Sequence, residues 1–257
     1  MRIVIKIGTS TLTYATGNLH IRHTEALCKV ISDLKNAGHE IILVSSGAIG
    51  MGVGKLGLSE RPQDMPTKQA AAAVGQCQLM YFYDKLFSEY NHTVGQILIT
   101  GSDLHHPERS FNFQSTMERL LTLRVLPIIN ENDTVATEEI AVGDNDTLAA
   151  IVATTVQADL LILLSDIDGL YTADPRKQSD AKLIAHVWEV NEKILSLAGD
   201  KGSALGTGGM KTKLFAAELC TRQGTDMVIA NGADPSLLYG IVEGKEIGTR
   251  FHQKESK

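Results

Sequence analysis

Two lysines are the residues of this sequence whose placement first points to chemistry. Lys6 lies inside the apolar stretch Arg2–Ile7, and Lys213 lies about one turn into a predicted helix. A buried lysine normally has a partner. Lys6 therefore either ends in water at the end of its strand or is aimed at an anion such as a transferring phosphate. Asp146 and Asp133 are the candidate partners that would hold such a lysine charged and in place.

A dense group of carboxylates and amides lies in the middle of the chain, at Asn130, Asp133, Asp144, Asn145 and Asp146. The group does not fit a calcium loop, which needs a glycine at its sixth position and a glutamate at its twelfth. Carboxylates mixed with asparagines suit the binding of an amino group and the orientation of lysines.

Glycine-rich and polar segments occur where predicted strands meet helices or loops. Glycines let backbone N–H groups approach an anion, and a helix N-terminus adds a favourable potential. The segment Gly206–Lys213 fits a phosphate cradle. Neither a P-loop motif nor a strand-borne GxGxxG motif occurs, which disfavours P-loop enzymes and dinucleotide dehydrogenases. The segments are Lys6–Ser10, Ser45–Gly50, Asn130–Asp133, Gly143–Asp146 and Gly206–Lys213.

The sequence shows no nucleophile and base pair of its own. His105 and His106 are adjacent and lack metal-site spacing, so we expect them to have a surface or packing role. No GxSxG motif occurs. If a substrate carboxylate were the nucleophile, no base would be needed, because its pKa of about 4.3 leaves it ionised at neutral pH. Catalysis would then consist of positioning and charge stabilisation, as in phosphoryl transfer.

Alternating strands and helices must position these residues. Strands that are apolar on both faces predict a parallel or mixed sheet covered on both sides, with ligands beyond the carboxyl ends of the strands. We expect Gly75 to interrupt the longest helix. The predicted strands are 2–7, 40–44, 93–99, 125–129, 159–164, 182–187, 226–230 and 248–251, and the predicted helices are 21–37, 67–90, 111–123, 146–156 and 209–222.

Composition narrows the class of protein. The 257 residues are 43% hydrophobic and carry a formal net charge of −6, which favours a globular domain over a nucleic-acid binder. Apolar runs such as Leu160–Leu164 are too short to span a membrane, and the first residues do not resemble a signal peptide. Three widely spaced cysteines predict buried thiols in a reducing cytoplasm.

The ordered set of motifs resembles the amino-acid kinase family, and within it the kinases that act on free L-glutamate. The resemblance extends over roughly residues 2–251. It rests on KIGTS (6–10), SSGAI (45–49), KQAAAAVGQ (68–76), INEND (129–133), GDND (143–146), SDIDGLYTADP (165–175) and GTGGMKTK (206–213).

The resemblance implies an α/β fold, an open three-layer α/β/α sandwich around a mainly parallel sheet. It implies one kinase domain over residues 1–257, with a substrate lobe to about residue 155 and a nucleotide lobe from about residue 156. The implied reaction is ATP-dependent phosphorylation of the γ-carboxylate of L-glutamate, the first step of proline biosynthesis. It further implies a cytoplasmic homo-oligomer, L-proline as an inhibitor, and a reductase that consumes the product.

Carried over position by position, the resemblance assigns roles to individual residues. Lys6 and Lys213 would neutralise the transferring phosphoryl group, and Asp146 would orient both lysines. Mg²⁺ would bridge the ATP phosphates, mainly through water and phosphate oxygens rather than protein ligands. Glutamate would be bound by Ser46, Asp133 and Asn145, with Gly47, Ala48 and Asn130 nearby. ATP would contact Lys6, Gly8, Ser165, Asp166, Thr207, Gly208, Gly209, Met210, Lys211, Thr212 and Lys213.

Two departures and three alternatives accompany this interpretation. Longer relatives carry a C-terminal PUA domain, which we expect to be absent because the sequence ends at Lys257. Lys211 stands where a small or polar residue is expected, and we predict that it faces solvent. The alternatives are a kinase for N-acetylglutamate or aspartate, a non-catalytic sensor of ATP or amino acids, and an RNA-binding protein, which the net charge disfavours.

Overall fold

The structure, a computed structural model, describes residues 1–14, 16–136, 145–198 and 209–254. Its strands are β1 (Arg2–Ile7), β2 (Glu40–Ser45), β3 (Val94–Ile99), β4 (Leu126–Glu131), β5 (Leu160–Ser165), β6 (His186–Val187), β7 (Asp226–Asn231) and β8 (Thr249–Phe251). Within the described residues these eight strands form one sheet in the order β3-β4-β2-β1-β5-β7-β8-β6. The strands from β3 to β7 in that order are parallel, and β8 is antiparallel to β7.

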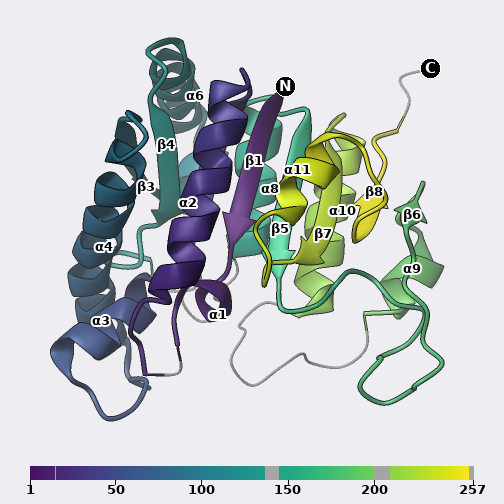
Figure 1. Cartoon of the computed structure of the whole chain (residues 1–257), viewed down its shortest axis with the longest axis horizontal. Helices are drawn as coiled ribbons and strands as arrows, with labels where there is room; N and C mark the ends of the chain where they lie inside the picture. The colour runs from purple at the N-terminus through teal and green to yellow at the C-terminus, as the bar shows by residue number, and fades with distance from the viewer. Residues whose placement is uncertain (15, 137–144, 199–208, 255–257) are drawn as a thin grey trace.

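Helices cover both faces of the sheet (Figure 1). Apolar side chains of α1, α2, α3, α4 and α11 join the core on one face, and those of α5, α6, α8 and α10 join the core on the other. The predicted three-layer α/β/α sandwich is therefore confirmed. The helices are α1 (Thr9–Leu12), α2 (Ile21–Asn36), α3 (Ala48–Leu56), α4 (Met65–Ser88), α5 (Gly101–His105), α6 (Pro107–Thr122), α8 (Asn145–Thr155), α9 (Glu192–Ser196), α10 (Met210–Arg222) and α11 (Leu237–Val242).

Strand β1 distributes its side chains between the two cores. Ile3, Ile5 and Ile7 belong to the core beneath α2 and α4, whereas Val4 belongs to the core beneath α8 and α10. Successive side chains of a strand point to opposite faces, so Lys6 shares the face of Val4. Lys6 is thereby directed toward α8 and α10, and the strand period alone decides which helices it can meet.

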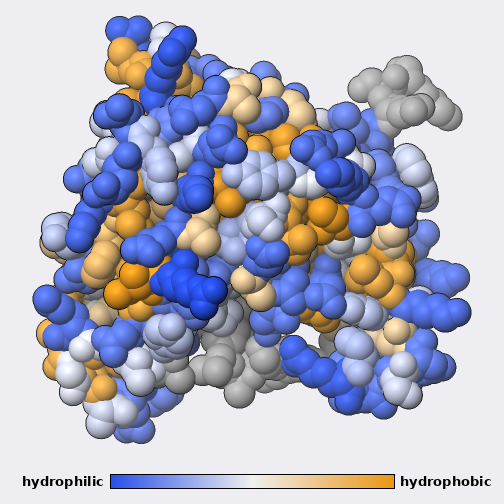
Figure 2. Space-filling view, in the orientation of Figure 1, coloured by the Kyte–Doolittle hydropathy of each residue, from blue (hydrophilic) through white to orange (hydrophobic). Residues whose placement is uncertain are grey.

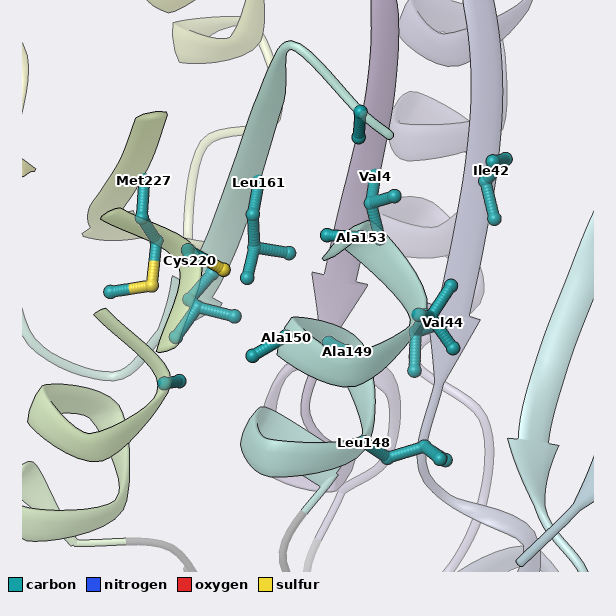
Figure 3. Packing of buried hydrophobic residues seen from close by; sticks show 14 of the residues in the cluster. Val4, Ile42, Val44, Leu148, Ala149, Ala150, Ala153, Leu161, Cys220 and Met227 are labelled. Carbon is teal, nitrogen blue, oxygen red and sulfur yellow. The ribbon is translucent and has the colours of Figure 1, made fainter. Parts of the chain in front are cut away.

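Helix α8 lies close against the sheet because its inward side chains are small (Figure 3). Ala149, Ala150 and Ala153 are fully buried, and Ala153 lies near Val4 of β1 in this view. Alanine has high helix propensity and a small side chain, so α8 can pack close to the sheet. The N-terminus of α8 is thus held near the carboxyl ends of β1 and β2, where the candidate site lies.

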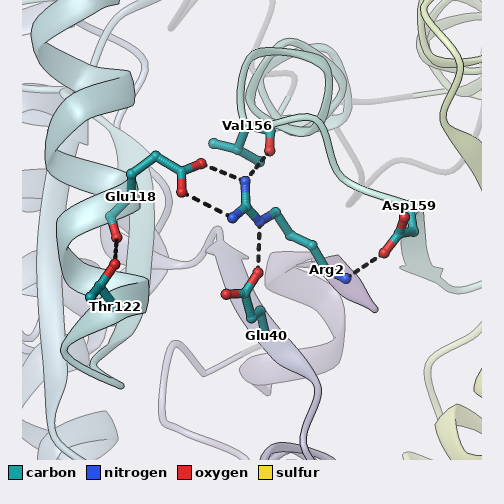
Figure 4. Close-up of polar contacts among 6 residues, drawn as sticks. All are labelled: Arg2, Glu40, Glu118, Thr122, Val156 and Asp159. Carbon is teal, nitrogen blue, oxygen red and sulfur yellow. Dashed lines mark hydrogen bonds and ion pairs between the residues drawn. The ribbon is translucent and has the colours of Figure 1, made fainter.

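Arg2 ties the opposite end of β1 to three other elements (Figure 4). Its guanidinium donates to both carboxylate oxygens of Glu118 on α6, at 2.5 and 3.1 Å, and to Glu40 at 2.9 Å. It also donates to the carbonyl of Val156 just after α8, at 2.5 Å. A two-pronged arginine–carboxylate contact fixes orientation as well as distance. This network anchors the end of the sheet that is remote from the chemistry.

Most predicted elements are confirmed with ends shifted by a few residues, and the short strand predicted at 182–187 is present only as β6. Two expectations are wrong, because helix α4 runs through Gly75 without a break and Cys77 is exposed. Cys28 and Cys220 are buried as expected, and all three thiols are free.

The outer surface of the helix layer that contains α2 and α11 is mostly hydrophilic (Figure 2). Within the part of the chain that the structure describes, no helix combines the length and hydropathy that a membrane span requires. His105 and His106 are exposed, in keeping with a surface role.

Candidate active site

The predicted site residues gather at the carboxyl ends of the central parallel strands, where the arrowheads of β1, β4 and β5 point in the same direction (Figure 1). Lys6 lies near the end of β1, Asn130 near the end of β4, and Ser165 at the end of β5. Ser46 directly follows β2. This is the edge at which open parallel sheets bind ligands.

A buried carboxylate joins the two lysines. The Lys6 Nζ lies 2.6 Å from Asp146 Oδ1, and the Lys213 Nζ lies 2.8 Å from Asp146 Oδ2. Asp146 is 1% exposed, Lys6 9% and Lys213 6%. Burial alone would raise the pKa of Asp146, but the two ammonium groups more than offset it, so the pKa is lowered below its usual value. Asp146 is therefore an ionised bridge that holds two positive charges side by side.

Three separate elements deliver this Lys–Asp–Lys triad. Lys6 comes from β1, directed by the strand period toward α8. Asp146 lies in the first turn of α8, where a negative side chain is favoured by the helix dipole. Lys213 lies in the first turn of α10, four residues after Gly209. Of the two partners suggested for Lys6, the structure selects Asp146.

A chain of polar side chains lies beside the triad. Asn145 Nδ2 donates to Ser46 Oγ at 2.8 Å and to Asn130 Oδ1 at 3.0 Å. Asn130 Nδ2 in turn donates to Gln76 Oε1 on α4 at 2.9 Å. Asn130 is 2% exposed and Gln76 is 8% exposed. Residues from four segments of the chain are thus joined, and three of them were predicted to lie at the substrate site.

Asp133 follows β4 and has an unusual environment. Its carboxyl group is partly buried, and that burial raises its pKa to about 6, against a smaller lowering by Arg61. Among the described residues it makes no direct hydrogen bond or ion pair, so it is not the partner of Lys6. The neighbouring candidate Asp144 lies outside the described residues. An unpaired carboxylate near this edge of the sheet remains able to bind a positively charged group.

The turn at Gly47 opens α3 and is held from behind by α4. Gly47 has φ +106°, a conformation that favours glycine, and no described side chain caps the helix at this residue. A Cβ at Gly52 would lie 1.8 Å from the carbonyl oxygen of Ala71, and one at Gly75 would lie 1.7 Å from that of Ala48. The backbones of α3 and α4 therefore touch directly, which fixes where the first N–H groups of α3 point.

Of the residues predicted to bind ATP, Lys6 and Lys213 belong to the triad, and the other described ones lie next to Lys6, at the end of β5 and at the start of α10. Gly8 follows Lys6 closely, and a Cβ there would lie 3.7 Å from its Nζ. Ser165, the last residue of β5, donates from its Oγ to Asp166 Oδ1 at 3.2 Å, and β5 is the neighbour of β1 in the sheet. Gly209 precedes α10, and no described side chain caps that helix. Thr207 and Gly208 lie outside the described residues.

Three residues of the first turn of α10 face different surroundings. Thr212 Oγ1 lies 3.3 Å from Asp146 Oδ2 and 2.8 Å from the Gly209 carbonyl oxygen. Lys211 is exposed, as predicted, and Met210 is partly buried. Thr212 thus adds a hydroxyl to the oxygen that Lys213 also contacts.

Comparisons with known proteins identify the family of this chain. Residues 1–231 match the model of the amino acid kinase family. The chain belongs to this family. It is 55% identical over 250 residues to the glutamate 5-kinase of Clostridium tetani, covering 97% of this chain and 94% of that protein. It is 53% identical over 257 residues to the glutamate 5-kinase of Carboxydothermus hydrogenoformans, covering 100% of this chain and 69% of that protein.

Solved structures of the same fold are more distant. A carbamate kinase from Giardia lamblia bound to AMP-PNP has a TM-score of 0.66 at 18% identity, with 98% of each chain covered. A UMP kinase from Bacillus anthracis has a TM-score of 0.66 at 16% identity, covering 100% of this chain and 97% of that one. These likenesses confirm the fold of an amino acid kinase.

Two features of this amino acid kinase were not predicted from its sequence. One is the contact of Gln76 with Asn130, and the other is the backbone contact made by Gly75. A signal for both was present, since Ala71, Ala72, Gly75, Gln76 and Leu79 form the buried stripe of α4. A glutamine and a glycine within such a stripe indicate a buried hydrogen bond and a close helix contact.

Proposed function

We propose that this chain catalyses the ATP-dependent phosphorylation of the γ-carboxylate of L-glutamate, giving L-glutamate 5-phosphate, as the first step of proline biosynthesis. The observation that carries the proposal is the buried triad of Lys6, Asp146 and Lys213 beside the amides of Asn130 and Asn145. Two cations suit a transferring phosphoryl group, and the amides suit an amino-acid substrate. Relatives with 53–55% identity that carry the name glutamate 5-kinase support glutamate as that substrate.

The reaction needs little acid–base chemistry. A γ-carboxylate oxygen forms a bond to the γ-phosphorus of ATP, and the bond from that phosphorus to the β-phosphate oxygen breaks, so that ADP leaves. The γ-carboxylate is already ionised at neutral pH, because its ordinary pKa is about 4.3. No enzyme base is required, and the protein contributes positioning and charge stabilisation.

Lys6 and Lys213 supply the charge stabilisation in this proposal. Their ammonium groups meet the negative charge on the transferring phosphoryl oxygens, and Asp146 keeps the two cations ionised and close despite their mutual repulsion. Gly8 and the first turn of α10 after Gly209 would present backbone N–H groups to the ATP phosphates. Ser165 and Asp166 would contact the nucleotide, on the side of the sheet that begins with β5.

On the substrate side, different protein groups would bind the ammonium group and the carboxylates of glutamate. The carboxylate of Asp133 would attract the α-ammonium group, together with the side chain of Asn145. The hydroxyl of Ser46 and the backbone N–H groups at Gly47 and Ala48 would bind carboxylate oxygens. All of these glutamate-binding residues belong to the proposed substrate lobe, which extends to about residue 155, and the proposed nucleotide lobe begins at about residue 156.

Mg²⁺ fits the site only as a companion of ATP. No group of three or more candidate metal ligands occurs among the described residues, and the most buried carboxylate, Asp146, is already engaged by the lysines. Mg²⁺ would therefore be held by phosphate oxygens and water, its common mode of binding. When bound, it supplies further neutralisation of phosphate charge.

Three further properties belong to the same proposal. An acyl phosphate hydrolyses readily, so we place a reductase directly after this enzyme in the reaction sequence. L-Proline would inhibit by occupying the glutamate site. The functional unit would be a homo-oligomer.

A hydroxylamine trap tests the reaction directly. Purified protein and Mg-ATP are supplied in turn with L-glutamate, N-acetyl-L-glutamate and L-aspartate, and the hydroxamate formed from the acyl phosphate is measured. We expect hydroxamate with L-glutamate alone. Hydroxamate with another acid only would overturn the choice of substrate, and none with any acid would overturn the proposed activity.

A further inference from the structure

The orientation of every amide in the chain between α4 and α8 follows from one donor whose identity is fixed. The backbone N–H of Glu131 lies 2.9 Å from the Asn130 side chain, and a backbone N–H can only donate. The atom of Asn130 that faces it must therefore be Oδ1. The other end of that amide, Nδ2, then faces Gln76, which must present Oε1.

The same reasoning continues toward the substrate side. Asn130 Oδ1 also faces the amide of Asn145, so Asn145 must present Nδ2, which lies 3.0 Å away. That nitrogen donates to Ser46 Oγ as well, at 2.8 Å. Both N–H groups of Asn145 are thereby used, since an amide nitrogen has only two.

What remains available for a ligand has a defined polarity. Asn145 keeps its Oδ1, which can only accept, and among the described residues that oxygen has no partner. Ser46 accepts from Asn145 and so keeps its hydroxyl proton for donation. The acceptor, Asn145 Oδ1, can bind a free ammonium group of a ligand, and the donor, the Ser46 hydroxyl, can bind a carboxylate of the same ligand. An N-acylated amino group has no such cation.

Gln76 closes this chain at its far end, where it accepts one hydrogen bond and donates none to the described residues. Its Oε1 accepts from Asn130, while its Nε2 is buried and has no hydrogen-bond partner within the described structure. A buried amide nitrogen without a partner is unfavourable. The orientation of Gln76 is therefore imposed by Asn130, and the residue contributes an acceptor that holds Asn130 in place.

We propose that Gln76 is a positioning residue that sets the donor and acceptor pattern offered to the substrate, and with it the preference for a free amino acid. This inference rests on the proposed function, because it concerns the same substrate site. Gln76 acts through Asn130 and Asn145. Its position on α4 is rigid, because the adjacent Gly75 packs directly against α3.

The test compares two variants of Gln76 with a matched control on the same helix. Gln76→Met removes the acceptor at similar length, whereas Gln76→Glu keeps an oxygen that accepts from Asn130. Gln78→Met is the control: it makes the same Gln-to-Met substitution two residues along α4, at a partly buried side chain for which no hydrogen bond is described. KM for L-glutamate, KM for ATP, kcat and the melting temperature with and without glutamate are measured.

We expect Gln76→Met to raise KM for glutamate about tenfold, the effect of one lost buried hydrogen bond, and to change KM for ATP and kcat by less than about threefold. Glutamate should raise its melting temperature less than it raises that of the wild type. Gln76→Glu should stay within about threefold of the wild type, and Gln78→Met should match it. The inference would be overturned if Gln76→Met changed KM for glutamate, KM for ATP and kcat by similar factors. It would also be overturned if Gln76→Glu raised KM for glutamate as much as Gln76→Met does.

A second comparison does not depend on turnover. Asn130→Asp places an acceptor opposite Gln76, which can then turn its amide and donate Nε2. Combined with Gln76→Glu, the same change sets two acceptors against each other. We expect the double variant to melt at a lower temperature than the sum of the single shifts predicts. Additive shifts would refute the polarity argument, even if the wild type proved inactive toward glutamate.

Discussion

Replacing Asp146 by asparagine is the substitution whose effect can be predicted most directly from the structure. The change keeps the shape of the side chain and removes the negative charge between Lys6 and Lys213. In the protein the two Nζ atoms lie 2.6 and 2.8 Å from opposite oxygens of that carboxylate. The asparagine oxygen can accept from only one side with full strength, and its N–H₂ group faces the other ammonium.

The expected size of the effect follows from the burial of all three groups. Removing one partner of a buried ion pair costs about 3–5 kcal/mol, because the remaining charge stays buried without compensation. We take about 3 kcal/mol, since one hydrogen bond to asparagine survives. For a chain of this size that corresponds to a fall in melting temperature of about 6–12 °C. The same free energy lost from the transition state would lower kcat about 10²-fold.

ATP should partly restore the stability of this variant. Its phosphates bring negative charge to the two lysines, so Mg-ATP is expected to raise the melting temperature of Asp146→Asn by more than it raises that of the wild type. The assay is differential scanning fluorimetry with and without Mg-ATP, together with the hydroxamate assay. Asp84→Asn removes an exposed carboxylate of α4 and serves as the control for the change in net charge.

Two results would refute this reasoning. If Asp146→Asn melted at the same temperature as Asp84→Asn, the buried triad would not exist in solution. If it melted lower but kept the kcat of the wild type, the triad would be structural, and the two lysines would not serve phosphoryl transfer.

Three further predictions concern the same site. Burial raises the pKa of Asp133 to about 6, so the ionised form that binds an ammonium group appears as the pH rises through about 6. We therefore expect kcat/KM for glutamate to rise as the pH passes through about 6 in the wild type, and this step to be lost in Asp133→Asn. The stability that the protonated carboxyl contributes is complete below its ordinary pKa of 3.8 and is lost as the pH rises from there to about 6. Gly75→Ala should destabilise the protein by about 1–3 kcal/mol, measured by urea unfolding, and raise KM for glutamate, because a Cβ would lie 1.7 Å from the Ala48 oxygen. An unchanged midpoint would show that the two helices can move apart freely. Lys213→Ala should lower kcat about 10²–10³-fold with little change in KM for glutamate, whereas Lys85→Ala at an exposed position should change neither.

The sheet and the face that carries each strand residue could be predicted because their signals are local. The runs of Ile, Val and Leu in β1, β2 and β5 are too apolar for surface loops and indicate buried strands. The alternation of side chains along a strand then places Lys6 on one face of the sheet. The sequence narrowed the partner of Lys6 to Asp133 or Asp146. Choosing between them required knowing that α8 packs on the face that Val4 occupies, which depends on contacts between distant segments.

Helix α3 and the role of Gly75 could not be predicted for the opposite reason. Residues 48–56 contain Gly50, Gly52 and Gly54, and glycine disfavours helices by about 1 kcal/mol relative to alanine. Contact with α4 overrides that local preference. Gly75 was expected to interrupt α4 on the same local ground, yet it lies where the backbone of α3 packs directly against α4. Local propensity and tertiary contact conflict in both helices, and tertiary contact decides the outcome.

The first turn of α8 couples the two halves of the proposed reaction. Asn145 belongs to the amide chain that would read the substrate, and the next residue, Asp146, holds the two lysines that would meet the phosphoryl group. Adjacent residues of one helix cannot shift independently. Because the buried alanines of α8 pack against the sheet, a displacement of this helix would move Asn145 and Asp146 together, and with them both proposed sites. In the proposed reaction, the packing of α8 would therefore help to align the glutamate carboxylate with the phosphoryl group that Lys6 and Lys213 meet.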